Sequence, residues 1–500
     1  MDIKGDSLIF TAFNYDRIEI FKYLLKLGAS GNLYNHGCML LTMVIEYKPF
    51  LVKYLLKHPI NIITKDKWGN TPLLDAIHHN NVVVVYYLMN YCKKNNILLN
   101  INEKNDLGVY PLLESIQQNN IEIAQLLINY SKENNIIIDI NEHDHRGLNS
   151  ILSAIYQNNI SILRLLIVYA EEQNIFLKIN KGNYEGDFPL LIAIEKNNID
   201  MVKLIINYCN KNNVILDINK KNNTNSSPLK KALSINNTEI VKLLVNYAKR
   251  YNIPININTQ NYEEFLFPLI YYNNFKLVKL LLDFFDKNNT ILDINRVGKN
   301  DFTPLLLAVF CDSVVSVKYI IQYADRHNIV LNITKTGHNG DFPIQMAIYR
   351  RNYKIIKLLT QYALKHHINI DLNKKDHSGN FLFLEAVHQN NLKIVKRLIK
   401  FADSRNFKIS INEIDNIRDY PLLMAVYNNN TEMVKLLIDY ANEHSMVLTI
   451  NNKNFKGESS LSVALDNKNK EIYDLLMDYA NAHNINELET NQYKRRRISK

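Results

Sequence analysis

The sequence has 500 residues, of which 47% are hydrophobic and 22% are charged, and its formal net charge is +10. This apolar fraction is enough for a buried core and excludes a wholly disordered chain. Residues 1–6 carry charges where a signal peptide needs an apolar segment, and no run of about 18 apolar residues marks a membrane span. Four cysteines without a Cys-x-x-Cys pair are typical of a reducing compartment. We therefore expect a cytoplasmic or nuclear protein, whose positive charge permits an acidic partner without requiring one.

One pattern repeats along almost the whole chain. Two short units begin at Gly5 and Gly37, and eleven longer units follow, each with a Pro-Leu-type signal. The first residue of that signal is Pro72, Pro111, Ser150, Pro189, Pro228, Pro268, Pro304, Pro343, Leu382, Pro421 or Ser460. The spacing is 39 residues except around Pro268, where steps of 40 and 36 predict a unit that lacks three residues of its first helix. This period predicts a solenoid of thirteen units: shorter units in residues 1–67, expanded units in residues 68–485, and a tail in residues 486–500.

Each long unit is predicted to contain two helices. In residues 111–127 the apolar positions follow a helical spacing in two segments, which are separated by Asn119-Asn120. An Asn-Asn pair recurs at this break in most units, where the chain needs a left-handed residue. Thr71, Ser227 and Thr303 precede a proline and are predicted N-caps of first helices.

The units resemble the ankyrin repeat, whose pattern is Gly-x-Thr-Pro-Leu-His-x-Ala-Ala followed by Val-Val-x-Leu-Leu. Gly69, Thr71-Pro72-Leu73, Ala76 and Val84-Val85 match it well. The resemblance covers residues 1 to about 485 and implies an all-α solenoid of helix-turn-helix units joined by hairpin-like loops. The histidine after Pro-Leu is absent, and an aromatic often replaces the threonine, as at Tyr110 and Phe188. We predict that an apolar contact between neighbouring units takes the place of the Thr–His hydrogen bond.

The second departure from the ankyrin pattern is length. About six extra residues per unit are predicted to lengthen the second helix by more than a turn. This helix carries an aromatic at one fixed position: Tyr91, Tyr130, Tyr169, Tyr208, Tyr247, Phe284, Tyr323, Tyr362, Phe401, Tyr440 and Tyr479. We predict that these rings form core between units and that each phenol reaches a polar edge.

Few residues suggest chemistry. His143-Asp144-His145 is the densest metal-like cluster, but it lacks a matching third or fourth ligand, so we expect a solvated loop and no metal site. No phosphate loop, nucleophile elbow or His-Glu-x-x-His motif occurs, and we expect neither catalysis nor a cofactor. Cys92 and Cys209, three units apart, are expected to be core thiols.

Two basic features bear on nucleic acids. A lysine ladder from Lys203 to Lys435 lies on the predicted second helices, but it lacks the aromatic or arginine interleaving that a nucleic-acid groove needs. We therefore expect a solvated face there and no nucleic-acid partner. The tail contains Lys494-Arg495-Arg496-Arg497, which is either a nuclear-import signal or a plain solvated tail.

The resemblance implies that partners bind in the concave groove formed by hairpins and first helices. Large aromatics at the groove position of four successive units are candidate anchors. The candidate partner-binding residues are Phe310, Tyr349, His388 and Tyr427, with Arg350 to pair with an acidic group, and Trp68 at a hairpin tip. The alternative is that these rings pack sideways on each other and on the hairpins.

These features predict a non-catalytic scaffold or adaptor, monomeric, that binds a protein partner and no small-molecule substrate or membrane. The alternative is a nuclear regulator that uses its basic tail and lysine ladder to contact nucleic acid or an acidic chromatin protein.

Overall fold

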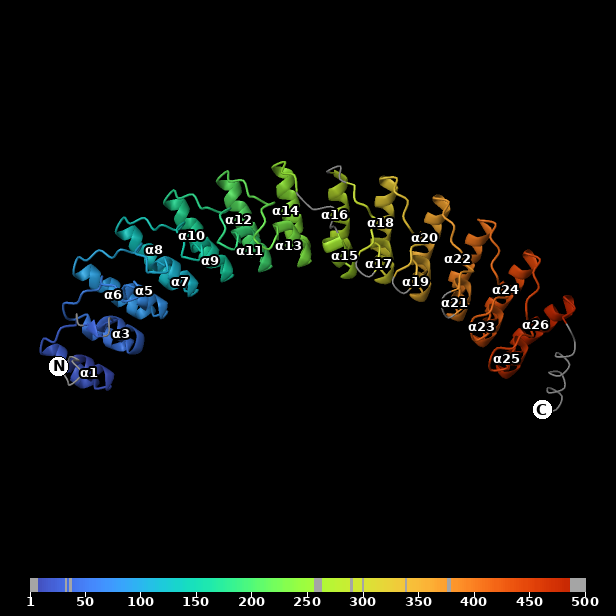
Figure 1. Ribbon diagram of the computed structural model, residues 1–500, viewed down its shortest axis with the longest axis horizontal. Helices are drawn as coiled ribbons and strands as arrows, with labels where there is room; N and C mark the ends of the chain where they lie inside the picture. Colours follow the sequence, from blue (N-terminus) through green and yellow to red (C-terminus); the bar gives the residue numbers. More distant parts are fainter. Residues whose placement is uncertain are drawn as a thin grey trace. The chain divides into compact units, whose positions relative to one another are not determined.

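The computed structural model describes residues 8–31, 34–35, 38–255, 263–287, 291–298, 301–337, 340–375 and 379–485. Within these ranges the regular secondary structure is almost entirely helical (Figure 1), which confirms the predicted all-α solenoid. The residues cluster into two halves of the chain, which we call unit 1 (1–257) and unit 2 (258–500). Each of these numbered units contains several of the repeat units described above.

In unit 1 the helices come in consecutive pairs. The pairs are α1 (Leu8–Asn14) with α2 (Ile18–Lys26), α3 (Leu40–Tyr47) with η1 (Pro49–Leu51) and α4 (Val52–Leu55), α5 (Pro72–His78) with α6 (Val82–Lys94), α7 (Pro111–Gln117) with α8 (Ile121–Glu133), α9 (Ser150–Tyr156) with α10 (Ile160–Glu172), α11 (Pro189–Glu195) with α12 (Ile199–Lys211), and α13 (Pro228–Ser234) with α14 (Thr238–Arg250). Two short strands, β1 (Tyr34–Asn35) and β2 (Cys38–Met39), pair antiparallel before α3.

Unit 2 continues the pairing. Its pairs are α15 (Glu263–Tyr271) with α16 (Phe275–Lys287), α17 (Pro304–Phe310) with α18 (Val314–Arg326), α19 (Pro343–Tyr349) with α20 (Tyr353–Lys365), α21 (Leu382–His388) with α22 (Leu392–Asp403), α23 (Pro421–Tyr427) with α24 (Thr431–Glu443), and α25 (Ser460–Asp466) with α26 (Lys470–Ala482). In both units the first helices of adjacent pairs pack side by side, and so do the second helices. We call the side formed by first helices and hairpin-like loops the first-helix face.

The helix boundaries follow from local chemistry. The side chains of Thr71, Ser227 and Thr303 accept the N–H of the third residue that follows each of them, as the predicted N-caps should. At the break inside most pairs an asparagine is left-handed, with φ of 56° at Asn119 and 53° at Asn158. The predicted breaks are therefore confirmed.

The prediction for the unit around Pro268 is wrong. α15 has 9 residues, so its first helix is not shortened, and Pro268 lies inside the helix instead of at its start. Proline at the first helical position marks the helix start elsewhere in the chain, which is why the spacing misleads here.

The lengthened second helices are confirmed: α6, α8 and α10 have 13 residues each, against 9 in α2. Their tyrosines lie between units as predicted. The buried Tyr169 hydroxyl accepts the N–H of Ile138 in the preceding unit at 2.9 Å, and Tyr208 accepts that of Leu177 at the same distance. Each such bond ties a second helix to the extended segment before it.

Asparagines add a second tie between units that the sequence analysis did not foresee. The Asn141 side chain donates to the carbonyl of Phe176 at 2.9 Å and accepts the N–H of Lys178 at 3.0 Å. The same two bonds recur at Asn102, Asn180, Asn295, Asn373 and Asn412. The extended segments are thereby held without a β-sheet.

Most of the aromatics that replace the ankyrin threonine are buried, as predicted, whereas Phe267 is half-buried. At Tyr110 and Tyr420 the ring also makes a hydrogen bond to the next unit, so the predicted exchange of a hydrogen bond for an apolar contact is wrong at these two positions. Tyr110 is 1% exposed, and its hydroxyl lies 2.8 Å from Ser150 Oγ of the next unit. Tyr420 makes the equivalent contact with Ser460 at 3.0 Å. Cys92 and Cys209 are buried free thiols, and burial raises the pKa of each to about 12.

Candidate protein-binding face

The hairpin-like loops turn on an aspartate or asparagine. Asp144 Oδ1 accepts the N–H groups of Arg146 and Leu148, both at 2.9 Å, and Gly147 is left-handed with φ of 78°. The same turn is built on Asp66, Asn105, Asn183 and Asn222 in unit 1 and on Asp415 and Asn454 in unit 2.

The expected solvated loop at residues 143–145 is wrong for Asp144. Asp144 is 1% exposed, and its Oδ2 accepts from the Arg146 guanidinium at 3.0 Å, whereas His145 is exposed. Its carboxylate is used by the turn and by Arg146. Among the residues that the structure describes, no group of three or more potential ligands is placed to hold a metal ion.

Successive loops in unit 1 are joined at their tips. The N–H of Asp106 donates to the carbonyl of Trp68 at 3.1 Å, and that of His145 donates to the carbonyl of Leu107 at 2.9 Å. The bonds from Tyr184 to Arg146 and from Asn223 to Glu185 continue the series. The tips therefore form a row in which Trp68 and Leu107 are 55% and 65% exposed.

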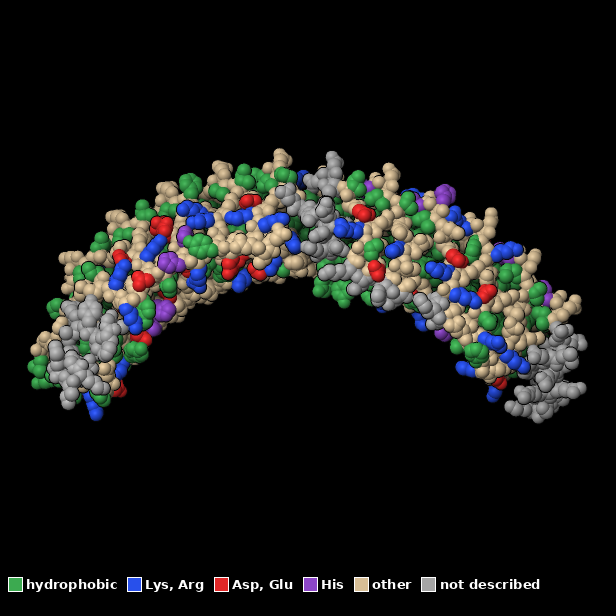
Figure 2. Space-filling model, viewed as in Figure 1, with side chains coloured by type: hydrophobic (Ala, Val, Ile, Leu, Met, Phe, Trp, Pro, Cys, Tyr) green, Lys and Arg blue, Asp and Glu red, His purple; other side chains and the backbone are tan. Residues whose placement is uncertain are grey.

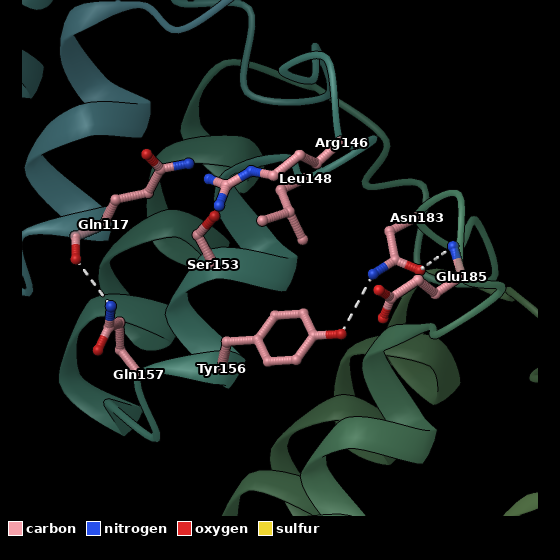
Figure 3. A pocket seen from close by; sticks show the side chains of 8 residues that line it. All are labelled: Gln117, Arg146, Leu148, Ser153, Tyr156, Gln157, Asn183 and Glu185. Atoms are coloured by element: carbon pink, nitrogen blue, oxygen red, sulfur yellow. Dashed lines mark hydrogen bonds between the residues drawn. The ribbon is translucent and has the colours of Figure 1, made fainter.

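The predicted groove position, at the end of each first helix, makes a contact that the sequence analysis missed. Tyr156 donates to Asp187 Oδ2 at 3.0 Å and accepts from Asn183 Nδ2 at 3.1 Å, so its ring spans the gap to the next loop (Figure 3). Gln117 donates to Asp144 Oδ2 at 3.2 Å from the same position. An Asn or Asp 27 residues later is the sequence signal that could have revealed this contact.

In unit 2 two of the candidate anchors pack within the chain. Tyr427 donates to Glu458 and accepts from Asn454 Nδ2 at 3.2 Å, which repeats the arrangement of Tyr156. Phe310 is half-buried with its ring edge-on to Phe302 at 5.4 Å. The sideways-packing alternative therefore describes these two rings.

The other candidates are open to solvent. Tyr349 is 36% exposed and His388 is exposed, with its Nδ1 4.0 Å from Glu385 Oε2. Arg350 is exposed and its guanidinium lies over the Phe310 ring at 5.1 Å. Trp68 has the Lys67 ammonium over its ring at 4.2 Å.

Two adjoining clefts open on the first-helix face of unit 1, with volumes of about 570 and 470 Å³. Gln117 and Arg146 line both clefts. The first cleft extends to Trp68 and Glu114, and the second to Ser153 and Glu185 (Figure 3). We call the two clefts together the unit 1 groove; the sequence analysis had placed its main candidate site in unit 2.

Comparison with protein families identifies the repeat. A family model described as ankyrin repeats (3 copies) matches residues 8–97, 171–259 and 383–487, which is more than half of the chain. The chain belongs to the ankyrin-repeat family. Among curated proteins no relative matches it. Ankyrin repeats are generally protein–protein interaction modules and are typically non-catalytic.

In this ankyrin-repeat protein, Glu114 in the unit 1 groove and Asp75 in α5 are buried acids. Glu114 is 7% exposed, accepts from Gln118 Nε2 at 2.9 Å and lies 2.8 Å from His78 Nδ1. Burial, with a smaller contribution from Asp66, raises the pKa of Asp75 to about 7.

None of the helices in the described ranges has the length and apolar composition that a membrane crossing needs.

The basic features of the ankyrin-repeat chain are only partly described. Lys494, Arg495, Arg496 and Arg497 lie outside the described residues, so the import signal stays a prediction. In the lysine ladder, Lys435 pairs with Glu471 at 2.7 Å, and Lys203 lies 3.8 Å from Glu239. At these two positions the ladder lysine therefore forms an ion pair with a carboxylate of the next repeat unit.

Proposed function

We propose that the protein is a non-catalytic scaffold or adaptor that binds a protein partner through its first-helix face. The observation that carries the proposal is the unit 1 groove, because a concave surface between loops and helices gives a partner side chain walls on several sides. Exposed aromatics on the first-helix face of each unit support it, since large rings in such positions are common binding anchors.

The candidate residues have different roles in the proposed interaction. Trp68, Tyr349, Arg350 and His388 contact the partner directly, because their side chains are exposed on the first-helix face. In the same proposal Phe310 and Tyr427 shape that face, since Phe310 supports Arg350 and Tyr427 is bonded to the following loop. The protein acts as a monomer in the cytoplasm or nucleus.

One observation favours the alternative, a nuclear regulator with an acidic partner. In unit 2 several cations lie over aromatic rings: Arg350 over Phe310, Lys374 over Phe342, Arg418 over Phe455, and Lys456 over Tyr427. Interleaved cations and rings are also a feature of surfaces that bind nucleic acid.

Affinity capture from lysate, with and without nuclease, tests the proposed function. The wild type is compared with two variants, Trp68→Ala and Tyr349→Ala/His388→Ala, whose helicity is checked by circular dichroism. We expect a nuclease-resistant protein partner that at least one variant loses. The matched control is Tyr23→Ala, at an exposed ring on the second helix α2.

Two outcomes contradict the scaffold. Capture that nuclease abolishes, and that deletion of residues 494–497 weakens, would favour the nuclear alternative. If all variants capture the partner at the same yield as the wild type, the first-helix face is not the binding surface.

A further inference from the structure

The unit 1 groove is acidic in a chain whose net charge is +10. Four of its lining residues are carboxylates, namely Asp106, Glu114, Asp144 and Glu185, and the fixed cation among them is Arg146. Arg146 is bonded to the buried Asp144, which offsets its charge. Asp106 and Glu185 are exposed at loop tips, and acidic side chains are visible among the basic ones on unit 1 in Figure 2. The groove therefore attracts cations that the chain as a whole repels.

Apolar surface alternates with these carboxylates along the groove. Trp68 and Leu107 are exposed at neighbouring loop tips, beside Asp106. Leu148 lies half-buried further along, in the cleft that Glu185 lines. Lysine and arginine combine an apolar stem with a charged head, and so match a wall of this composition. The Lys67 ammonium already lies over the Trp68 ring, which shows that this ring accepts a cation.

In the wall of the second cleft, Ser153 has a hydroxyl group with no hydrogen-bond partner among the described residues. Ser153 is 3% exposed, and its Oγ makes no hydrogen bond within the described residues. Figure 3 shows Ser153 among Gln117, Arg146 and Leu148, where it lines the cleft. Buried polar groups are normally satisfied, so an unused hydroxyl in the wall of a cleft indicates a bond that a ligand completes.

We infer that the unit 1 groove binds an extended segment of a partner protein that carries lysine or arginine side chains. This inference rests on the proposed function and names the partner's chemistry at one site. The apolar stems lie against Trp68 and Leu107, and the charged heads reach Asp106 and Glu185. A polar group of the segment, or the Arg146 guanidinium when the segment displaces it, bonds to Ser153. Four successive loops spaced about 10 Å apart span about 30 Å over their three intervals, which matches an extended segment of roughly ten residues.

Peptide titration of the full chain tests the inference. The probe is a fluorescein-labelled ten-residue peptide of alternating arginine and alanine, and its comparators carry glutamine or glutamate in place of arginine. Binding is followed by anisotropy and by emission of Trp68, the single tryptophan. We expect the arginine peptide to bind at least tenfold more tightly than either comparator and to weaken as salt is raised.

Matched variants locate the site. Asp106→Asn/Glu185→Gln should weaken binding of the arginine peptide at least tenfold. The control variant Glu133→Gln/Glu172→Gln removes two carboxylates from second helices of unit 1, α8 and α10. It should leave binding of the arginine peptide unchanged. Ser153→Ala should weaken binding severalfold without lowering the urea midpoint, because it removes a hydroxyl that makes no hydrogen bond within the part of the chain that the structure describes.

Each contrary outcome identifies what has failed. Equal binding of the three peptides, or equal weakening by both double variants, overturns the inference because the groove then has no selectivity for cations. If the wild type still captures a protein from lysate in that case, the proposed function stands and only the partner chemistry is wrong. If it captures no protein at all, the proposed function fails as well.

Discussion

At the scale of single residues, burial changes the protonation of Asp75. This carboxyl lies in α5 at 8% exposure, and its pKa is raised from 3.8 to about 7. Burial is the main cause; Asp66 and Glu46 add to it, and His78 opposes it. The folded chain therefore keeps a proton between about pH 4 and pH 7 that the unfolded chain has released. Stability from this group falls as pH rises through that range and is constant above it.

Asp75→Asn should remove this pH dependence. Relative to the wild type, the variant should gain about 2–3 kcal/mol of unfolding free energy between pH 5 and pH 8, at about 1.4 kcal/mol per pKa unit. Urea unfolding followed by Trp68 emission measures this, because Trp68 lies in the loop just before α5. A stability difference between variant and wild type that is the same at both pH values would contradict the raised pKa. Asp106→Asn, at an exposed carboxylate, is the control.

At the scale of the helix pair, two residues make each junction, and in most pairs both are asparagines. In the α9–α10 pair Asn158 is left-handed, and Asn159 Oδ1 caps α10 by accepting from Ile162 N at 3.0 Å. Asn159 Nδ2 also donates to Asn119 Oδ1 of the preceding unit at 2.7 Å. One side chain thus begins a helix and links two units. Ser313 does both in unit 2, since it caps α18 and its hydroxyl donates to Asn273 Oδ1.

Asn159→Ala should cost about 1–3 kcal/mol, the sum of a cap and one bond between units. Asn159→Ser should cost less than half of that, because Ser313 shows that serine can make both contacts. Hydrogen exchange of α10 measures the loss. Asn129→Ala is the control, since Asn129 is exposed on α8 and is bonded within its own helix to Gln125. Unchanged protection of α10 in the alanine variant would show that the junction does not depend on this side chain.

Features that a residue imposes on its own backbone could be predicted from the sequence, whereas contacts between residues of different repeat units could not. The helix starts, the asparagine breaks and the repeat spacing could be predicted, because proline and asparagine act on their own backbone. The contact from Gln117 to Asp144 could not, since it joins residues of different units and depends on how the loops pack. For the same reason Tyr427 was expected to face a partner, whereas it is bonded to the next loop. Pro268 misled because a proline inside a helix has the same sequence signal as one at its start.

At the scale of the whole molecule, the packing is local along the chain. Within each unit the first helix of a pair packs on the first helices of adjacent pairs, and the second helices do likewise. In such a solenoid, stability is approximately a sum of intrinsic terms for each repeat and of terms for its interfaces with its neighbours. Damage at one pair should therefore weaken the neighbouring pairs first.

Leu166→Ala tests this locality. Leu166 is fully buried in α10, and its truncation should cost about 2–5 kcal/mol. Hydrogen exchange followed by mass spectrometry should show lost protection in α8, α10 and α12, while α20 to α26 in unit 2 keep theirs. Val168→Ala, at a 49% exposed position of the same helix, should leave all of these helices protected. Equal loss of protection in both units would mean that the solenoid unfolds as one cooperative body. In that case a partner bound in the unit 1 groove would stabilise unit 2 as well.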